Sequence, residues 1–164
     1  MNAAAAPESE FTITRELNAP LADVWDAWVN ADSIAEWWGP QGFTGRVVRS
    51  DFREGGSTLT SMSNPDFGTM HNAWNYTRIV PNERIEFEMT FADAEGNAIE
   101  PPIPGVPLAV PHVVSFRDLG DGRTELSVTE SGYTDEQAMQ ISRAGQEQVL
   151  DKLISAVDRR LIAR

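Results

Sequence analysis

The stretch Ile85-Glu-Phe-Glu-Met-Thr-Phe91 places four apolar residues alternately with three polar ones. Successive side chains of a strand point to opposite faces, so this pattern predicts a strand with one buried face and one solvated face. Such half-buried strands are typical of antiparallel sheets. Residues 69–80 predict a long neighbouring strand, joined to the first by a turn at Pro81-Asn-Glu83.

The sheet extends in both directions from this pair. Upstream, residues 43–62 predict two strands joined by a turn at Arg53-Glu-Gly-Gly56. Downstream, residues 92–111 are rich in proline and predict a long loop, a feature that is usually functional or mobile. Residues 112–116 and 123–130 then predict a hairpin.

The two ends of the chain predict helices. Thr134-Asp-Glu-Gln137 predicts a capping box at the start of a long C-terminal helix, whose apolar stripe contains Val149, Leu150, Leu153, Val157 and Leu161. Near the N-terminus, residues 11–17 alternate like a strand, and Pro20 predicts the first position of a short helix. A second short helix follows Asn30 or Asp32 and ends before Gly39-Pro40.

This order of elements predicts an α+β fold. A bent antiparallel sheet of about six to seven strands wraps around the long C-terminal helix, and the two short helices after the first strand close one end. Such an arrangement tends to leave a cavity between sheet and helix, where small molecules commonly bind.

Composition narrows the classes of partner. The chain has 164 residues and a net charge of -12; we expect residues 1–10 to be a disordered lead-in and residues 11–164 to form one domain. The acidic charge argues against nucleic acid, and no apolar run is long enough for membrane insertion. The N-terminus has no basic segment of the kind that starts a signal peptide, so we expect a cytoplasmic protein. Without cysteine or a calcium-type loop, we expect no metal and no cofactor.

Several short motifs occur in a family-like order: Trp37-Trp-Gly-Pro40, Asp51-Phe-Arg-Glu-Gly-Gly56, Met62-Ser-Asn-Pro-Asp66 and Ile79-Val-Pro-Asn-Glu-Arg-Ile85. With them the chain resembles a bacterial-type, single-domain member of the heat-shock-protein-90 ATPase activator homologue family, in the START-like (SRPBCC) superfamily. The resemblance implies a helix-grip fold over residues 11–160. One departure stands out, because such families often carry Gly-Trp where this chain has Gly145-Gln146.

Four apolar residues are candidates for the wall of the cavity. Trp37 and Trp38 are adjacent on a helix and point about 100° apart; we expect Trp37 to pack on the scaffold and Trp38 to face the cavity entrance. Met89 and Phe91 lie on the inner face of their strand, far from the turn at residues 81–83. Val149 contributes from the long helix.

The two histidines are candidates for chemistry. Pairing Phe116 with Leu126 in the hairpin places His112 opposite Glu130, roughly 5 Å apart on the inner face. A carboxylate beside an imidazole can prepare it as a general acid or base, but a purely structural pair near the end of the sheet is the favoured interpretation.

The face of the strand at residues 69–80 stays open. Counting back from a pairing of Ile79 with Ile85 points His71 inward and Trp74 outward, where Trp74 and Tyr76 would form an apolar patch suited to a homodimer. A bulge would reverse both faces. His71 and Trp74 are therefore both candidates for ligand binding.

Three hypotheses follow for function. The first is a binding protein for a small hydrophobic or aromatic molecule, contacted by Trp38, His71, Trp74, Met89, Phe91, His112, Glu130 and Val149. The second is an enzyme of cyclase, dehydratase or hydrolase type, with His112, Glu130 and His71 as weak catalytic candidates. The third is a co-chaperone-like protein-interaction module.

Overall fold

The computed structural model describes residues 9–164. Residues 1–8 of the expected lead-in lie outside the described residues, but Ser9 and Glu10 belong to the first strand, which starts earlier than predicted. The elements are β1 (Ser9–Leu17), α1 (Leu21–Val29), α2 (Ala31–Trp37), β2 (Thr44–Ser50), β3 (Ser57–Asn64), β4 (Gly68–Val80), β5 (Arg84–Ala92), β6 (Val110–Gly120), β7 (Arg123–Tyr133) and α3 (Glu136–Ile162).

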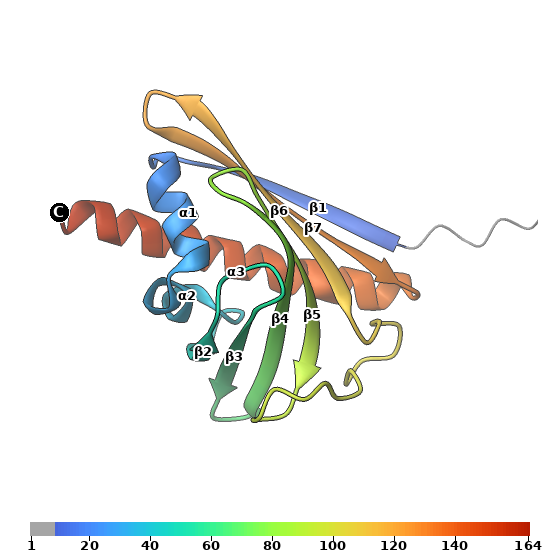
Figure 1. Cartoon of the computed structure of the whole chain (residues 1–164). Helices are drawn as coiled ribbons and strands as arrows, with labels where there is room; N and C mark the ends of the chain where they lie inside the picture. The colour runs from blue at the N-terminus through green and yellow to red at the C-terminus, as the bar shows by residue number, and fades with distance from the viewer. Residues whose placement is uncertain (1–8) are drawn as a thin grey trace, which may run out of the picture.

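One antiparallel sheet of seven strands forms the body of the molecule, in the order β1-β7-β6-β5-β4-β3-β2. It bends around α3, while α1 and α2 lie at the end where α3 finishes (Figure 1). This is the helix-grip fold that the order of elements predicted. Among residues 9–164, no helix is both long and apolar enough to cross a membrane.

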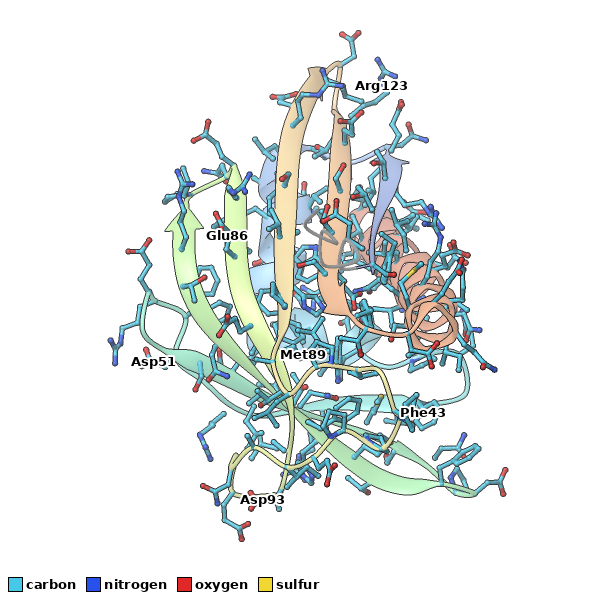
Figure 2. All side chains as sticks on the ribbon, turned by 90° about the vertical axis from the view of Figure 1, so that its right-hand side faces the viewer. Phe43, Asp51, Glu86, Met89, Asp93 and Arg123 are labelled. Atoms are coloured by element: carbon cyan, nitrogen blue, oxygen red, sulfur yellow. The ribbon has the colours of Figure 1, made fainter. Side chains whose placement is uncertain are left out.

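The strand β5 follows its alternation closely. Ile85 and Phe87 are buried and Glu88 is exposed. Met89 and Phe91 lie on the same inner face but are only partly buried, because the sheet and α3 separate there. In Figure 2, Met89 lies between the hairpin tip marked by Arg123 and the turn marked by Asp93.

The helix α3 covers the concave face with a buried stripe that includes Val149, Leu150, Leu153 and Val157. Its start differs from the predicted capping box. Asp135 is the N-cap, and its carboxylate accepts a hydrogen bond from the backbone N–H of Gln137 at 3.0 Å. Thr134 instead donates to the loop before β6, through its backbone N–H to the carbonyl oxygen of Gly105 at 3.0 Å.

The first short helix begins one residue later than predicted, and the second follows Asn30, one of its two predicted caps. Pro20 is the N-cap of α1, not its first residue. Asn30 caps α2, accepting a hydrogen bond from the N–H of Asp32 at 3.0 Å. After α2, Gly39 has a φ of 91°, a left-handed conformation that favours glycine. The chain turns here and leads to β2.

A bulge in β4 decides which faces its side chains occupy. Ile79 does pair with Ile85, but the register shifts between Tyr76 and Arg78. The extra residue rotates every earlier side chain to the opposite face. Trp74 and Tyr76 are therefore buried inside, and His71 lies on the outer face. Of the two alternatives left open by the sequence, the bulged one is correct, and the exposed Trp74–Tyr76 patch does not form.

The proline-rich loop between β5 and β6 packs against the core in its second half, whereas most of residues 94–100 are exposed. Ile103 and Val106 rest against the core, and Gly105 accepts the hydrogen bond from Thr134 described above. The loop thereby forms one edge of the space between the sheet and the first turns of α3.

Candidate functional site

A cavity of about 130 Å³ lies between α3 and the concave face of the sheet. Strands β3, β4, β5, β6 and β7 supply one wall, α3 the opposite wall, and the segment after α2 and the loop before β6 supply the sides. Its lining residues are Trp38, Gly39, Pro40, Met62, Asn72, Met89, Phe91, Val106, Val110, Glu130, Tyr133, Ser142, Gly145, Gln146 and Val149.

The adjacent tryptophans have separate positions. Trp37 is fully buried, packs on Trp28 with ring centroids 4.7 Å apart, and donates from Nε1 to the carbonyl oxygen of Ala27 at 2.9 Å. Trp38 packs edge-on against Trp74 at 4.9 Å and lines the cavity. The two rings therefore divide between scaffold and cavity, and ligand contact by Trp38 stays a prediction.

A buried polar cluster forms one end of the cavity, centred on the carboxylate of Glu130. Tyr133 donates its hydroxyl to Glu130 Oε1 at 2.7 Å, and Gln146 donates from Nε2 to Oε2 at 2.7 Å. His112 lies directly opposite Glu130 across β6 and β7, as the sequence predicted, with Nε2 3.5 Å from Oε1. Both His112 and Glu130 are almost fully buried.

The imidazole of His112 is held between two oxygen acceptors. Its Nδ1 lies 2.9 Å from the carbonyl oxygen of Val110, which can only accept, so Nδ1 carries a hydrogen. Its Nε2 faces Glu130 Oε1 on the other side of the ring. The ring is also stacked on Phe87 at 4.7 Å, which fixes its plane.

Both tyrosines of the inner face resist ionisation. Burial raises the pKa of Tyr133, and the charge of Glu130 raises that pKa further. Burial also raises the pKa of Tyr76 to about 12, against the opposing effect of its hydrogen bond with Thr58. Tyr133 therefore stays a hydrogen-bond donor to Glu130 over the physiological range.

Lys152 holds the segment that forms one side of the cavity. Its ammonium lies 2.9 Å from the carbonyl oxygen of Gly39 and 3.0 Å from that of Phe43. It also lies 3.4 Å and 3.5 Å from the carbonyl oxygens of Trp38 and Pro40. Burial lowers the pKa of this ammonium, while the carbonyl oxygens favour its charged form.

Five of the predicted ligand-binding residues line the cavity: Trp38, Met89, Phe91, Glu130 and Val149. Three do not. His112 lies behind Glu130 and reaches the cavity only through it. Trp74 is fully buried, in a parallel stack with Phe87 at 5.1 Å. His71 lines a separate hollow of about 410 Å³ beside Asp93 and Glu100, away from His112, so the two histidines do not share a site.

Sequence reasoning missed several lining residues, above all Gln146, Asn72 and Tyr133. Gln146 had one signal, because it stands where the resemblance would place tryptophan. Asn72 had none, since its inward direction depends on the bulge later in β4. Tyr133 extends β7 beyond the predicted end at Glu130.

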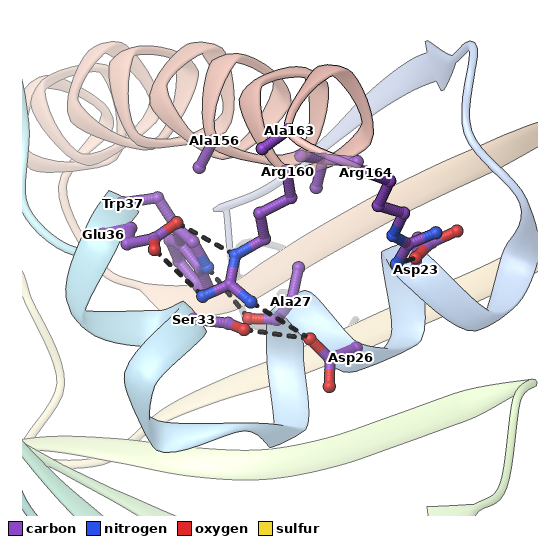
Figure 3. A pocket seen from close by; sticks show the side chains of 11 residues that line it. Asp23, Asp26, Ala27, Ser33, Glu36, Trp37, Ala156, Arg160, Ala163 and Arg164 are labelled. Atoms are coloured by element: carbon purple, nitrogen blue, oxygen red, sulfur yellow. Dashed lines mark hydrogen bonds and ion pairs between the residues drawn. The ribbon is translucent and has the colours of Figure 1, made fainter.

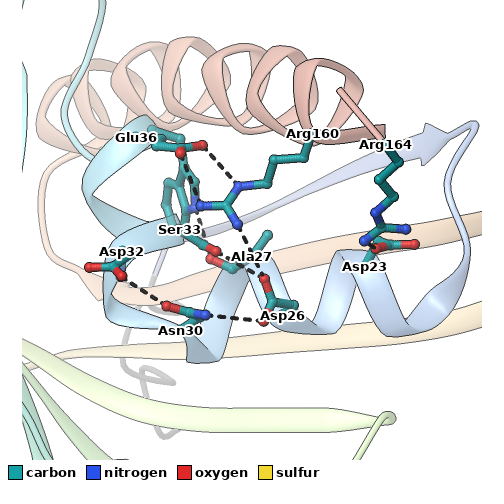
Figure 4. Close-up of polar contacts among 10 residues, drawn as sticks. Asp23, Asp26, Ala27, Asn30, Asp32, Ser33, Glu36, Arg160 and Arg164 are labelled. Atoms are coloured by element: carbon teal, nitrogen blue, oxygen red, sulfur yellow. Dashed lines mark hydrogen bonds and ion pairs between the residues drawn. The ribbon is translucent and has the colours of Figure 1, made fainter. Parts of the chain in front are cut away.

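A second hollow, of about 300 Å³, lies between α1, α2 and the end of α3. Arg160 forms a two-point contact with Glu36, at 3.1 Å and 2.9 Å, and lies 3.8 Å from Asp26 (Figure 3). Asp26 also accepts a hydrogen bond from Ser33 at 2.9 Å, and Arg164 pairs with Asp23 (Figure 4).

Charged groups in this second hollow are matched within the chain. The hydrogen bonds with Glu36 raise the pKa of the Arg160 guanidinium. Paired charges of this kind join α3 to the short helices. We therefore assign a structural role to this hollow. We place the candidate ligand site in the smaller cavity between α3 and the concave face of the sheet. Across residues 9–164, no group of three or more His, Asp or Glu side chains is arranged to hold a metal ion.

A bent antiparallel sheet gripping a long helix, with a cavity between them, defines a protein of the START-like class. The family model described as "Activator of Hsp90 ATPase homolog 1-like protein" matches residues 18–158, and the chain belongs to that family. No curated protein sequence matches the chain.

Solved bacterial structures share the fold. Protein Ms6760 of Mycobacterium smegmatis is 25% identical with a TM-score of 0.75, over 93% of this chain and 90% of that one. Protein CV1439 of Chromobacterium violaceum is 26% identical with a TM-score of 0.75, over 90% of this chain and 96% of that one. A Staphylococcus epidermidis protein, 20% identical over 97% of this chain and 95% of its own, has a TM-score of 0.78 and supports the fold alone.

Proposed function

We propose that this protein binds a compact, mainly apolar molecule of about one aromatic ring in the cavity between the sheet and α3. The enclosing wall of aromatic and aliphatic side chains, including Trp38, Met89 and Phe91, supports this proposal. Membership of a START-like family supports it as well, since proteins of this class commonly bind hydrophobic ligands. A dry cavity of about 150 Å³ is known to take up benzene, so 130 Å³ suits a ligand of that size.

The observation that carries the proposal is Gly145. It is the one glycine within α3, where glycine costs about 1 kcal/mol relative to alanine. Neither backbone conformation nor close packing explains it, because Gly145 has no positive φ and a Cβ added there would meet no atom within 4 Å. Gly145 lines the cavity, so its missing side chain leaves room at the site and contributes nothing to the packing of the helix.

A blocking substitution tests the proposal. Toluene is titrated into the wild-type protein and into the variants Gly145→Leu and Gln140→Leu, with binding followed by calorimetry and by the shift in melting temperature. We expect Gly145→Leu to fill the cavity and weaken binding by about tenfold or more, without loss of stability, because leucine favours helix. Gln140 is exposed on the same helix, so Gln140→Leu should bind as the wild type does. Equal binding by Gly145→Leu, or no binding by the wild type, would overturn the proposal.

A second candidate, acid–base catalysis in the same cavity, is favoured by one observation: Glu130 lines the cavity and lies 3.5 Å from Nε2 of His112. Proton transfer would then pass through Glu130, with His112 as its positioning residue. Glu130→Gln should abolish turnover of an accepted substrate while toluene binding persists; retained turnover would remove this candidate. The interaction-module hypothesis loses its main support, because Trp74 is buried.

A further inference from the structure

Three side chains that line the cavity carry polar atoms without a hydrogen-bond partner among residues 9–164. These atoms are Nε1 of Trp38, Oδ1 of Asn72 and Oε1 of Gln146. The three residues are 7%, 1% and 8% exposed, so bulk water does not solvate them. A buried polar atom left without a hydrogen bond costs about 1–3 kcal/mol, so each of these atoms calls for a partner such as a ligand or bound water.

The orientation of Gln146 is determined by its neighbour. Nε2 donates to Glu130 Oε2 at 2.7 Å. An ionised carboxylate oxygen can only accept, so the amide group cannot turn around without placing two acceptors together. Oε1 of Gln146 is therefore held as a free acceptor beside the cavity, and it requires a donor.

The charges of the lining residues limit further the classes of ligand that the cavity can bind. None of the lining residues is Lys, Arg or His, so the cavity offers no counter-ion to a carboxylate or phosphate. Its one carboxylate, Glu130, already accepts hydrogen bonds from Tyr133 and Gln146 and lies 3.5 Å from His112 Nε2, so its oxygen atoms are occupied and a cation gains little there. Among the lining residues, the unpartnered atoms are two acceptors and one donor, which suits a neutral group able to donate and accept.

We infer that the ligand is a neutral single-ring aromatic molecule with a hydroxyl donor, of the phenol class, whose O–H is accepted by Gln146 Oε1. The ring lies among Met89, Phe91 and Val149, and the hydroxyl lies at the end of the cavity formed by Glu130. This inference rests on the proposed function and adds to it the polar group that Gln146 selects.

Phenol and toluene provide the test, because they differ by a hydroxyl in place of a methyl group. Each is titrated into the wild-type protein, Gln146→Leu and the exposed control Gln140→Leu. We expect Gln146→Leu to lose about tenfold in affinity for phenol, the upper range for one hydrogen bond, and to bind toluene as well as before or more tightly. Gln140→Leu should leave both affinities unchanged.

Gln146→Leu also removes the hydrogen bond that Gln146 donates to Glu130. A second measurement is therefore made on the wild-type protein, in which Glu130 keeps this hydrogen bond. The side-chain amide signals of Gln146 in the wild-type protein, assigned by their loss in Gln146→Leu, should shift with phenol and much less with toluene. Equal losses for both probes, no loss for either, or amide signals that respond alike would overturn the inference while leaving toluene binding, and so the proposed function, intact. No binding of either probe by the wild type would overturn both.

Discussion

Two adjacent tryptophans at the end of α2 differ in what their indole nitrogens contact. Nε1 of Trp37 donates to Ala27, whereas Nε1 of Trp38 has no protein partner and its residue lines the cavity. A substitution that keeps an aromatic ring but removes the nitrogen should therefore affect the two positions differently.

We predict that Trp37→Phe lowers the free energy of unfolding by about 1–3 kcal/mol, from the lost hydrogen bond and packing, with little change in toluene affinity. Trp38→Phe should destabilise the fold less, since it breaks no hydrogen bond, and should weaken toluene binding more. Denaturant unfolding and calorimetry measure the two quantities. The assignment is wrong if Trp38→Phe leaves toluene affinity at the wild-type value.

At the scale of single residues, the sequence predicted best what local geometry determines. His112 and Glu130 face each other because a hairpin pairs residues at fixed offsets from its turn, and that offset can be counted along the chain. Gln146 meets Glu130 only because α3 docks in one rotation and depth on the sheet. No spacing in the sequence encodes that rotation, so the donor that orients Glu130 was not predicted.

At the scale of elements, one inserted residue in β4 determines which side chains of that strand line the cavity. The bulge before Arg78 exchanges the two faces of β4, bringing Asn72 inside and His71 outside. Alternation alone cannot locate such a bulge, because both registers pair Ile79 with Ile85. The large aromatic residues Trp74 and Tyr76 favour the observed register, since burying both rings outweighs the loss of one regular pair.

The segment from Trp38 to Phe43 depends on α3 through the chain's single lysine. We predict that Lys152→Met lowers the free energy of unfolding by about 1–3 kcal/mol, because partly buried carbonyl oxygens lose their donor. It should also speed hydrogen exchange at the N–H groups of Gln41 and Phe43, which bond to Gln148 and Pro40.

Arginine should not replace this lysine. A compact ammonium can lie among several carbonyl oxygens, whereas the planar guanidinium directs its donors outward as a fork. The backbone N–H groups of this segment should therefore exchange almost as fast in Lys152→Arg as in Lys152→Met. The N–H groups of β6 and β7 serve as the internal control. Wild-type exchange rates in both variants would show that the segment holds its conformation without the ammonium.

At the scale of the whole molecule, the architecture was predictable because each level of the sequence agrees with it. Alternating strands, glycine-containing turns and a long amphipathic C-terminal helix leave few ways to bury all the apolar faces at once, and a sheet closing on that helix is one of them. Because the sheet and α3 together bury the tyrosines of the inner face, the ionisation of these tyrosines depends on the stability of the whole fold. It can be followed by titration.

The chain contains two tyrosines, Tyr76 and Tyr133, and both have raised pKa values in the folded state. Between the ordinary value of 10.0 and the folded value of about 12 for Tyr76, the unfolded chain has lost a proton that the folded chain retains. Stability that is fully present below pH 10 must therefore fall as the pH rises through this window.

We predict that native protein shows almost no tyrosinate absorbance near pH 10, and that the signal then rises together with loss of the circular dichroism of the fold. The variant Tyr76→Phe keeps the ring that packs on Phe52 at 4.9 Å. It loses the hydrogen bond with Thr58 and starts less stable at neutral pH, but its stability should fall less steeply above pH 10. Tyrosinate formation with a midpoint at pH 10 in a fully folded protein would contradict this, because it would require a hydroxyl open to water on a side that the sheet and α3 enclose.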